Sequence, residues 1–181
     1  RGYDCAFIYG GAGGFDYMNR FFGGNGYRVV DKPAWKKGEI SFETSWGACD
    51  EDLYHKVLSE ADLADAAGKP FHQFVMTTSN HRPFQFPDGG MRLKSDTGRH
   101  AAVLYADHAI GRFLDDARRH PWFERTLFVF CADHCASSAG RNELDVRRFR
   151  IPAIVWNPGL VPPREYAGLC SQIDLMPMGI R

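Results

Sequence analysis

The sequence lacks an excess of charge of either sign. Its 22 lysine and arginine residues balance 22 aspartate and glutamate residues, whereas a domain that binds nucleic acid usually carries a basic excess. Nucleic acid is therefore not an expected partner. The short basic cluster at Arg147, Arg148 and Arg150 is interpreted as a solvated face beside a strand, since short charge runs usually lie on the surface.

A membrane span and a disulfide framework are missing as well. No apolar run in residues 1–181 approaches the roughly 20 residues that cross a bilayer, and these residues do not show the pattern of a signal peptide. The number of cysteines is odd, and their spacing matches neither a disulfide framework nor paired C-x2-C knuckles. Most of them lie among apolar neighbours, so we expect small buried hydrophobic residues. They are Cys5, Cys49, Cys131, Cys135 and Cys170.

What the sequence does contain is typical of one globular domain, with 44% apolar and 24% charged residues among 181. Short apolar segments alternate with helix-like segments, which predicts an α/β fold with a largely parallel sheet flanked by helices on both faces. In such sheets, ligands bind at the carboxyl ends of the strands. The predicted strands cover residues 4–9, 27–30, 71–77, 126–132 and 151–156, and the predicted helices cover 15–23, 51–67 (with Asp50 as its cap) and 97–119.

A carboxylate and an imidazole follow the most apolar predicted strand. The segment FVFCADHCASSAG runs from that strand into Asp133 and His134 and then into small polar residues. Both side chains can turn toward one point, and divalent cations accept such mixed oxygen and nitrogen ligands. The alternative is an aspartate that caps the next turn beside a locally bonded histidine. Cys131 and Cys135 flank the pair, but no second C-x2-C or H-x3-H partner exists, which argues against a thiolate zinc site.

A second predicted strand ends in a cluster of polar groups. The segment FVMTTSNHRPFQFP delivers hydroxyl, amide, imidazole and guanidinium groups to a loop closed by Pro83. Such groups suit an anionic, oxygen-rich ligand such as a phosphate ester. Within them, His81 can donate or accept a proton near neutral pH. The alternative is a Ser/Thr/Asn turn that binds no ligand.

Glycines separate the first predicted strand from the first predicted helix, in FIYGGAGGFDYMNRFF. Loops of this kind can cradle phosphate at a helix N-terminus. The spacing, however, fits neither G-x-G-x-x-G nor the P-loop. The glycines are equally compatible with a tight turn and close packing.

In this order, the motifs resemble one family, the lipoteichoic acid synthase/phosphoglycerol transferase branch of the sulfatase/alkaline phosphatase superfamily. The resemblance extends from Phe7 to Pro177. It implies that residues 1–181 are the C-terminal portion of one sulfatase-like catalytic domain, with the N-terminal portion and any membrane spans outside this chain. The segments that carry it are FIYGG…FDYMNRFFGGNGY, SWGACDEDLYHKVL, TTSNHRPFQFP, YADHAIGRFL, FCADHCASSAG, IPAIVWNPGLVPP and SQIDLMP.

The resemblance implies a role for several residues. Asp133 and His134 would bind a single divalent metal ion, most commonly Mn2+. His81 would act in catalysis and contact the phosphoglycerol group. The residues expected to bind substrate are His81, Arg82, Asp16 and Asn19.

The sequence departs from the family pattern in places. Gly11 and Ala12 stand where relatives often have an aspartate, and Met178 stands where a threonine usually follows the proline. The family's nucleophile is a threonine that opens a helix in the N-terminal half, and an upstream acidic residue completes the metal site. Neither motif precedes Gly10. Two ligands are fewer than a stable metal site normally has, so we expect the chain alone to bind metal weakly and to be inactive.

The activity that the resemblance implies is metal-dependent phosphoglycerol transfer. The enzyme would move a glycerol-phosphate head group from a phospholipid to a hydroxyl of a glycan or polymer, through a covalent threonine intermediate. Relatives are anchored in the cell inner (cytoplasmic) membrane, with the catalytic domain facing the periplasm or the exterior. Two alternatives stay open: a sulfate- or phosphate-ester hydrolase of the same superfamily, and a non-catalytic module that binds a glycan or lipid head group.

Overall fold

The computed structural model describes residues 2–88, 94–95, 97–136 and 149–175. The chain divides into two compact units, residues 1–122 and 123–181, and each is described by itself. Among the described residues, no helix is long and apolar enough to cross a membrane. Three residues singled out by the sequence, Arg147, Arg148 and Met178, lie outside the described part.

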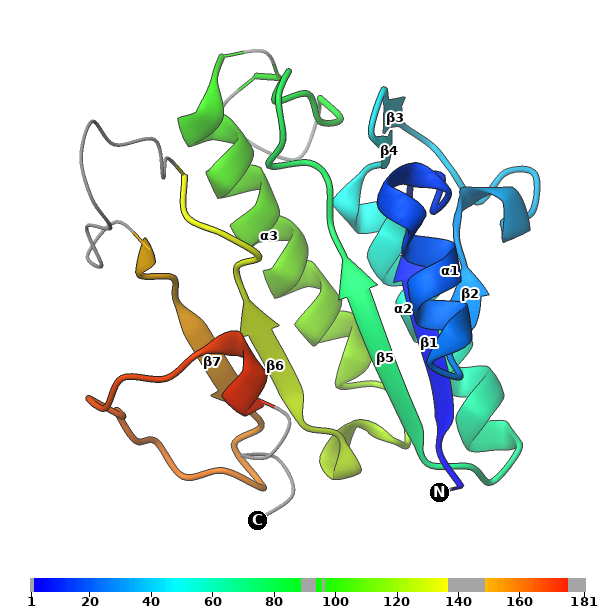
Figure 1. Cartoon of the computed structure of the whole chain (residues 1–181), viewed down its shortest axis with the longest axis vertical. Coiled ribbons are helices and arrows are strands. Elements are labelled where there is room, and N and C mark those ends of the chain that lie inside the picture. The colour runs from blue at the N-terminus through cyan, green and yellow to red at the C-terminus, as the bar shows by residue number, and fades with distance from the viewer. Residues whose placement is uncertain (1, 89–93, 96, 137–148, 176–181) are drawn as a thin grey trace. The chain divides into compact units, whose positions relative to one another are not determined.

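The first unit is built on a three-stranded parallel sheet in the order β2-β1-β5 (Figure 1). Its strands are β1 (Asp4–Tyr9), β2 (Arg28–Val30) and β5 (Phe71–Met76). β1 is the central strand, and its Phe7 and Ile8 are fully buried, as the continuous apolar run of a parallel strand covered on both faces requires. Parallel pairing brings the carboxyl ends of the three strands to one edge of the sheet.

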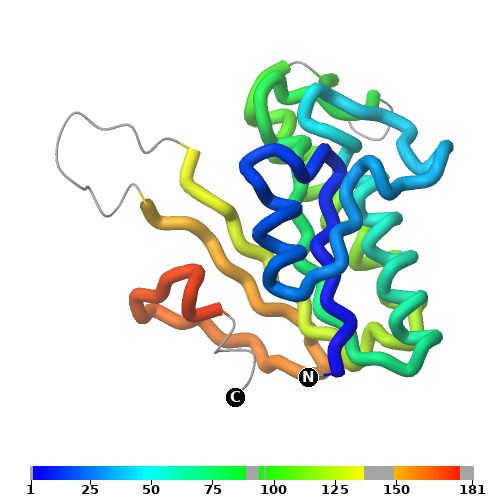
Figure 2. The backbone as a smooth tube through the Cα atoms, turned by 45° about the vertical axis from the view of Figure 1, so that its right-hand side comes forward, coloured from blue at the N-terminus to red at the C-terminus, as the bar shows by residue number. Residues whose placement is uncertain are grey.

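Helices cover both faces of this sheet, which confirms the predicted α/β fold class. α1 (Met18–Gly24) lies on one side, where its Phe22 ring stacks on Phe7 with 3.9 Å between ring centroids. α2 (Asp50–Ala66) lies on the other side against β1 and β5, and α3 (Arg99–Ala117) packs beside α2 (Figures 1 and 2). The shorter elements are η1 (Phe15–Tyr17), η2 (Lys32–Ala34), β3 (Glu43–Thr44) and β4 (Gly47–Ala48).

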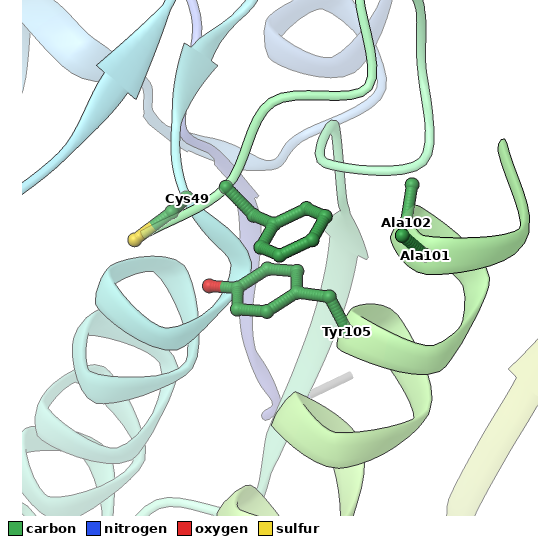
Figure 3. Close-up of a cluster of buried hydrophobic side chains, with 5 residues drawn as sticks. Cys49, Ala101, Ala102 and Tyr105 are labelled. Atoms are coloured by element: carbon green, nitrogen blue, oxygen red, sulfur yellow. The ribbon is translucent and has the colours of Figure 1, made fainter. Parts of the chain in front are cut away.

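A small buried cluster joins α3 to the start of α2 (Figure 3). Phe86 stacks on Tyr105 with 4.8 Å between ring centroids and an interplanar angle of 8°. Ala101 and Ala102 complete the cluster on the α3 side, and their small side chains leave room for the rings. Cys49 lies at the other side, next to the first turn of α2.

The cysteines are mostly not buried, so that prediction was wrong. Cys49 is buried, whereas Cys5 and Cys135 are partly exposed and Cys131 and Cys170 are exposed. Cys5 and Cys131 lie on strands, where successive side chains point to opposite faces. An apolar neighbour therefore does not imply a buried cysteine.

The second unit contains β6 (Phe128–Cys131) and β7 (Ala153–Trp156), which pair antiparallel. The sequence predicted both strands but not this orientation, because the alternation of strands and helices favours parallel pairing. An aromatic group of Phe123, Phe128 and Trp156 packs at one end of the pair. The remaining described turns of this unit are η3 (Phe123–Arg125) and η5 (Gln172–Asp174).

Candidate functional site

The carboxyl edge of the first unit's sheet is formed by loops that are bonded to one another through their backbones. The loop after β1 accepts a hydrogen bond at the Gly10 carbonyl from the Ala48 amide of β4, at 3.0 Å. The Gly11 carbonyl accepts one from the Lys32 amide, which follows β2, at 2.9 Å. The Thr78 hydroxyl after β5 donates to the Ala48 carbonyl at 3.2 Å. The β3–β4 hairpin is thus fastened to the ends of β1 and β5.

The glycines after β1 provide a seat for this hairpin. A Cβ atom on Gly11 would collide with the Trp46 carbonyl and the Tyr9 ring. Gly47 has φ +140°, and a Cβ atom there would lie 2.5 Å from the Gly10 carbonyl carbon. Close packing, rather than a phosphate cradle, therefore accounts for the glycines at these two contacts.

Asp31 holds the glycine loop against α1. Its buried Oδ2 accepts hydrogen bonds from the Gly13 amide and from Asn19 Nδ2, both at 2.9 Å. Asn19, expected to bind substrate, therefore uses its amide nitrogen inside the protein, while its Oδ1 is buried with no hydrogen-bond partner among the described residues. Asp31 was not among the residues predicted for the site, although a carboxylate directly after a parallel strand is a usable signal.

Asp16 lies in a different setting from Asn19. It is exposed and has φ +50°, and Tyr17 beside it has φ +56°. Left-handed backbone is uncommon for residues other than glycine, and it is enriched at functional sites. Together with Met18, Arg20 and Phe21, the two residues line an open pocket of 470 Å³. This places the expected substrate-binding Asp16 at a surface that a ligand can reach.

Asp50 is the first residue of α2, and its side chain is buried against the loop after β5. The prediction that it caps α2 was wrong, because the helix begins at Asp50 and Cys49 precedes it as N-cap without a side-chain bond. The Asp50 Oδ1 instead accepts hydrogen bonds from the amides of Thr78 at 3.2 Å and Ser79 at 3.0 Å. The Ser79 hydroxyl in return accepts from the Asp50 amide at 3.0 Å.

Burial dominates the electrostatics of Asp50. Its relative exposure is 1%, and Oδ2 has no hydrogen-bond partner within the described residues. Desolvation raises the pKa of the carboxyl group above its ordinary value, against the opposing effect of the hydrogen bonds from Ser79 and Thr78. The group is a structural anchor for the polar loop that contains His81.

His81 lies in a tight turn and is exposed. Its amide donates to the Thr78 carbonyl at 3.0 Å, and its carbonyl accepts from the Phe84 amide at 2.8 Å. Its Nδ1 lies 2.9 Å from the Arg82 carbonyl. Because a carbonyl can only accept, Nδ1 carries the proton in this arrangement and Nε2 of the neutral ring has a free lone pair. The Arg82 side chain is exposed beside it.

The His81 ring packs against an indole from the β3–β4 hairpin. The centroids of the Trp46 and His81 rings are 3.8 Å apart, with 44° between their planes. Phe15 contacts the same indole edge-on, at 5.6 Å and 89°. No local motif connects Trp46 with His81, which is 35 positions away, so the sequence did not point to this contact.

Asp133 and His134 lie in the second unit, directly after β6. The His134 amide donates to Asp133 Oδ1 at 2.8 Å, and His134 Nδ1 donates to the Cys135 carbonyl at 2.8 Å. His134 Nε2 is then 3.4 Å from Asp133 Oδ2. Gln172 Nε2 donates to the carbonyls of Ala132 and Asp133, each at 2.9 Å, which fixes the backbone at this strand end.

The donor set of this pair fits a divalent cation. A metal-binding histidine usually donates its other ring N–H to a carbonyl or carboxylate, as His134 does. His134 Nε2 and Asp133 Oδ2, 3.4 Å apart, are close enough for one ion to bind both atoms. Both side chains are also about 70% exposed, with values of 71% and 68%. In the described part of the chain, however, no group of three or more His, Cys, Asp and Glu side chains could hold a metal.

Comparison with known proteins gives one family-level match, to the model described as Sulfatase, which covers residues 1–178. Among curated proteins, the phosphoglycerol transferase I of Salmonella arizonae is 24% identical over 106 residues, which is 53% of this chain and 13% of that enzyme. The phosphoglycerol transferase I of Citrobacter koseri matches to the same extent.

Solved structures extend the similarity to the fold. A protein of the alkaline phosphatase superfamily from Vibrio parahaemolyticus is 39% identical with a TM-score of 0.78, covering 86% of this chain and 38% of that one. The lipoteichoic acid synthase LtaP from Listeria monocytogenes is 22% identical with a TM-score of 0.71, covering 90% of this chain and 45% of that one. The chain therefore spans less than half the length of these relatives.

Proposed function

The chain belongs to the sulfatase family, and on that premise we propose that it is part of a phosphoglycerol transferase. The similarity to two enzymes named phosphoglycerol transferase I carries this proposal. The sulfatase-family match and these relatives confirm the resemblance to the lipoteichoic acid synthase/phosphoglycerol transferase branch of that superfamily, and LtaP shares the fold. The proposed reaction moves a glycerol-phosphate head group from a phospholipid to a hydroxyl of a glycan or polymer. The nucleophile is proposed to be a threonine outside residues 1–181.

Asp133 and His134 are the proposed protein ligands of one divalent ion in the whole enzyme. His134 would bind through Nε2, because Nδ1 is committed to the Cys135 carbonyl, and Asp133 would bind through Oδ2, because Oδ1 accepts the His134 amide. Mixed carboxylate and imidazole ligands are compatible with Mn2+. A bound divalent ion would neutralise charge on a phosphoryl group and lower the pKa of a coordinated hydroxyl.

His81 is the proposed catalytic residue of the first unit. With Nδ1 held by the Arg82 carbonyl, Nε2 is the ring atom left for the substrate. The neutral ring would accept the proton of an attacking hydroxyl at Nε2, and the protonated ring would donate from Nε2 to a phosphoryl oxygen or a leaving group. The exposed Arg82 guanidinium would bind a phosphate oxygen, and the Asp16 carboxylate would accept from the glycerol hydroxyls.

The proposal is tested on the full-length protein with phosphatidylglycerol and, separately, an aryl sulfate. We expect Mn2+-dependent release of diacylglycerol, with glycerol phosphate appearing on an added glycan acceptor. Release of free glycerol phosphate without transfer would instead identify a hydrolase, and turnover of the aryl sulfate alone would identify a sulfatase. A protein that binds no stoichiometric metal and cleaves neither ester would be a binding module.

The proposed function also implies a cellular location for the catalytic domain. A phospholipid donor requires that the catalytic domain work at a membrane surface, and we propose the outer side of the cell inner membrane, with the domain facing the periplasm or exterior. The measurement is protease accessibility of the domain in intact spheroplasts. Protection of the domain in intact spheroplasts that disappears on their lysis would contradict it.

A further inference from the structure

Trp46 is in close contact with His81. The ring centroids are 3.8 Å apart, which is closer than the separation of about 4.5–7 Å typical of aromatic pairs. The indole comes from the β3–β4 hairpin, and the imidazole comes from the loop after β5. Phe15, from η1, contacts the indole edge-on. Three separate loops of the sheet edge thus meet through three aromatic rings.

The backbone around Trp46 is held on several sides. Its amide donates to Thr44 Oγ1 at 3.1 Å, and its carbonyl lies so close to Gly11 that a Cβ atom there would collide with it. Gly47 lies directly against Gly10, and the Ala48 amide donates to the Gly10 carbonyl. The position of the indole is therefore set by the end of β1, the central strand of the sheet.

The His81 ring has few restraints of its own. Its side chain is exposed, and one hydrogen bond, from Nδ1 to the neighbouring Arg82 carbonyl, restrains it within the protein that the structure describes. One bond to an adjacent residue fixes the tautomer but leaves the plane of the ring adjustable. The contact with the indole supplies a further restraint, because at a centroid separation of 3.8 Å the imidazole has little room to rotate about χ2.

We propose that Trp46 is a positioning residue for His81: the indole, seated on the glycines after β1, fixes the plane of the imidazole so that Nε2 is presented to the substrate. The inference rests on the proposed catalytic role of His81. It assigns a function in turnover to Trp46 and to the glycines after β1, although none of these residues touches the reacting atoms. A displacement of about 1 Å at a reacting group can reduce a rate by about a hundredfold.

The first test reads the ring contact directly, without any assay of turnover. The full-length protein is labelled with 13C-histidine, and the His81 ring signals are assigned by their absence in His81→Asn. We expect upfield-shifted His81 ring protons in the wild type, loss of that shift in Trp46→Ala, and partial retention in Trp46→Phe. The control is Trp35→Phe, whose indole donates to the Val30 carbonyl and contacts Lys56, and it should leave the His81 signals unchanged.

The second test separates positioning from folding and from substrate binding. For the phosphodiester that the wild type cleaves, Trp46→Ala should lower kcat by roughly tenfold to a hundredfold with little change in KM, and Trp46→Phe should recover part of the loss. Unchanged His81 signals in Trp46→Ala would overturn the proposal, and so would wild-type kcat in a Trp46→Ala protein whose His81→Ala counterpart is inactive. Failure of the wild type to cleave phosphatidylglycerol would overturn the proposed function instead, and the ring signals would still decide the role of Trp46.

Discussion

The two units hold their candidate residues in different ways. In the first unit, the loop that carries His81 is fixed by distant residues, since Asp50 binds the amides of Thr78 and Ser79 from 28 and 29 positions away. In the second unit, Asp133 and His134 are oriented mainly by each other and by the next carbonyl. A site held from a distance can be damaged by substitutions that never touch a ligand, whereas a locally held pair is sensitive chiefly to its own residues.

The largest expected effect is in the second unit. His134→Ala in the full-length enzyme should lower Mn2+-dependent turnover by at least about a thousandfold, because several kcal/mol of charge stabilisation would be lost with the ion. The melting temperature should be nearly unchanged, since the side chain is 71% exposed. Turnover and bound metal are measured together. The control is His55→Ala, an exposed histidine of α2; equal loss in both variants would remove His134 from the site.

His81→Ala should lower turnover by about a hundredfold to ten-thousandfold, the range typical of a lost general acid or base. Bound metal should remain at the wild-type level, and this separates the first unit's contribution from the second's. Activity and metal content of the purified full-length variant are the measurements. Loss of metal along with activity would mean that His81 has been given the wrong role.

Gly47→Ala tests whether the stability of the first unit depends on a residue that a ligand does not touch. The new Cβ atom would be strained at φ +140° and would press on the Gly10 carbonyl carbon, so we expect a loss of about 3 kcal/mol in unfolding free energy. Gly38→Ala is the matched control, because Gly38 also has positive φ but has open space around it, and it should lose only about 1 kcal/mol. Urea denaturation measures the unfolding free energy of both variants. Equal losses would show that the close contact between Gly47 and Gly10 does not restrict the residue at position 47.

The smallest expected effect is a change in the pH dependence of the unfolding free energy when Asp50 is replaced. Burial raises the pKa of this carboxyl in the folded state, so the folded protein binds the proton more tightly than the unfolded chain. The contribution of Asp50 to stability is then full below the ordinary pKa near 4 and is lost as the pH rises through the raised value. Asp50→Asn keeps an acceptor for the two amides without a charge, so it should become more stable relative to wild type as the pH rises above about 4, as measured by urea titration.

A difference between the Asp50→Asn and wild-type unfolding free energies that stays constant over this range would contradict the raised pKa. Asp50→Ala provides the structural counterpart. It leaves the amides of Thr78 and Ser79 without their acceptor, which should cost about 2–4 kcal/mol at low pH, where the carboxyl of the wild type is protonated.

The sequence predicted what depends on short-range pattern. The apolar runs predicted β1 and β5 almost to the residue, and the strand-end position of Asp133 and His134 could be read directly because both belong to one motif. The antiparallel pairing of β6 with β7 could not be read, because an apolar strand buried in either orientation has the same pattern.

The missed residues of the candidate site share a physical cause. Asp31, Trp46 and Asp50 act on partners that are 12 to 35 positions away in the sequence, so their roles arise only when the sheet brings the loops together. Asp50 was noticed but assigned to a helix cap, since an aspartate before a helix is the usual signal for one. Its bonds to the loop after β5 are long-range contacts that local propensity does not contain.

The buried thiol of Cys49 offers a practical consequence. Desolvation raises its pKa to about 11, and it lies in the cluster with Tyr105 under the hairpin (Figure 3), so an alkylating reagent can reach a reactive thiolate only when that cluster opens. The exposed Cys131 and Cys170 and the partly exposed Cys5 and Cys135 would be modified first and can be blocked or replaced. The rate of the slow alkylation that remains at Cys49 would then report how often the buried cluster of Cys49 and Tyr105 opens.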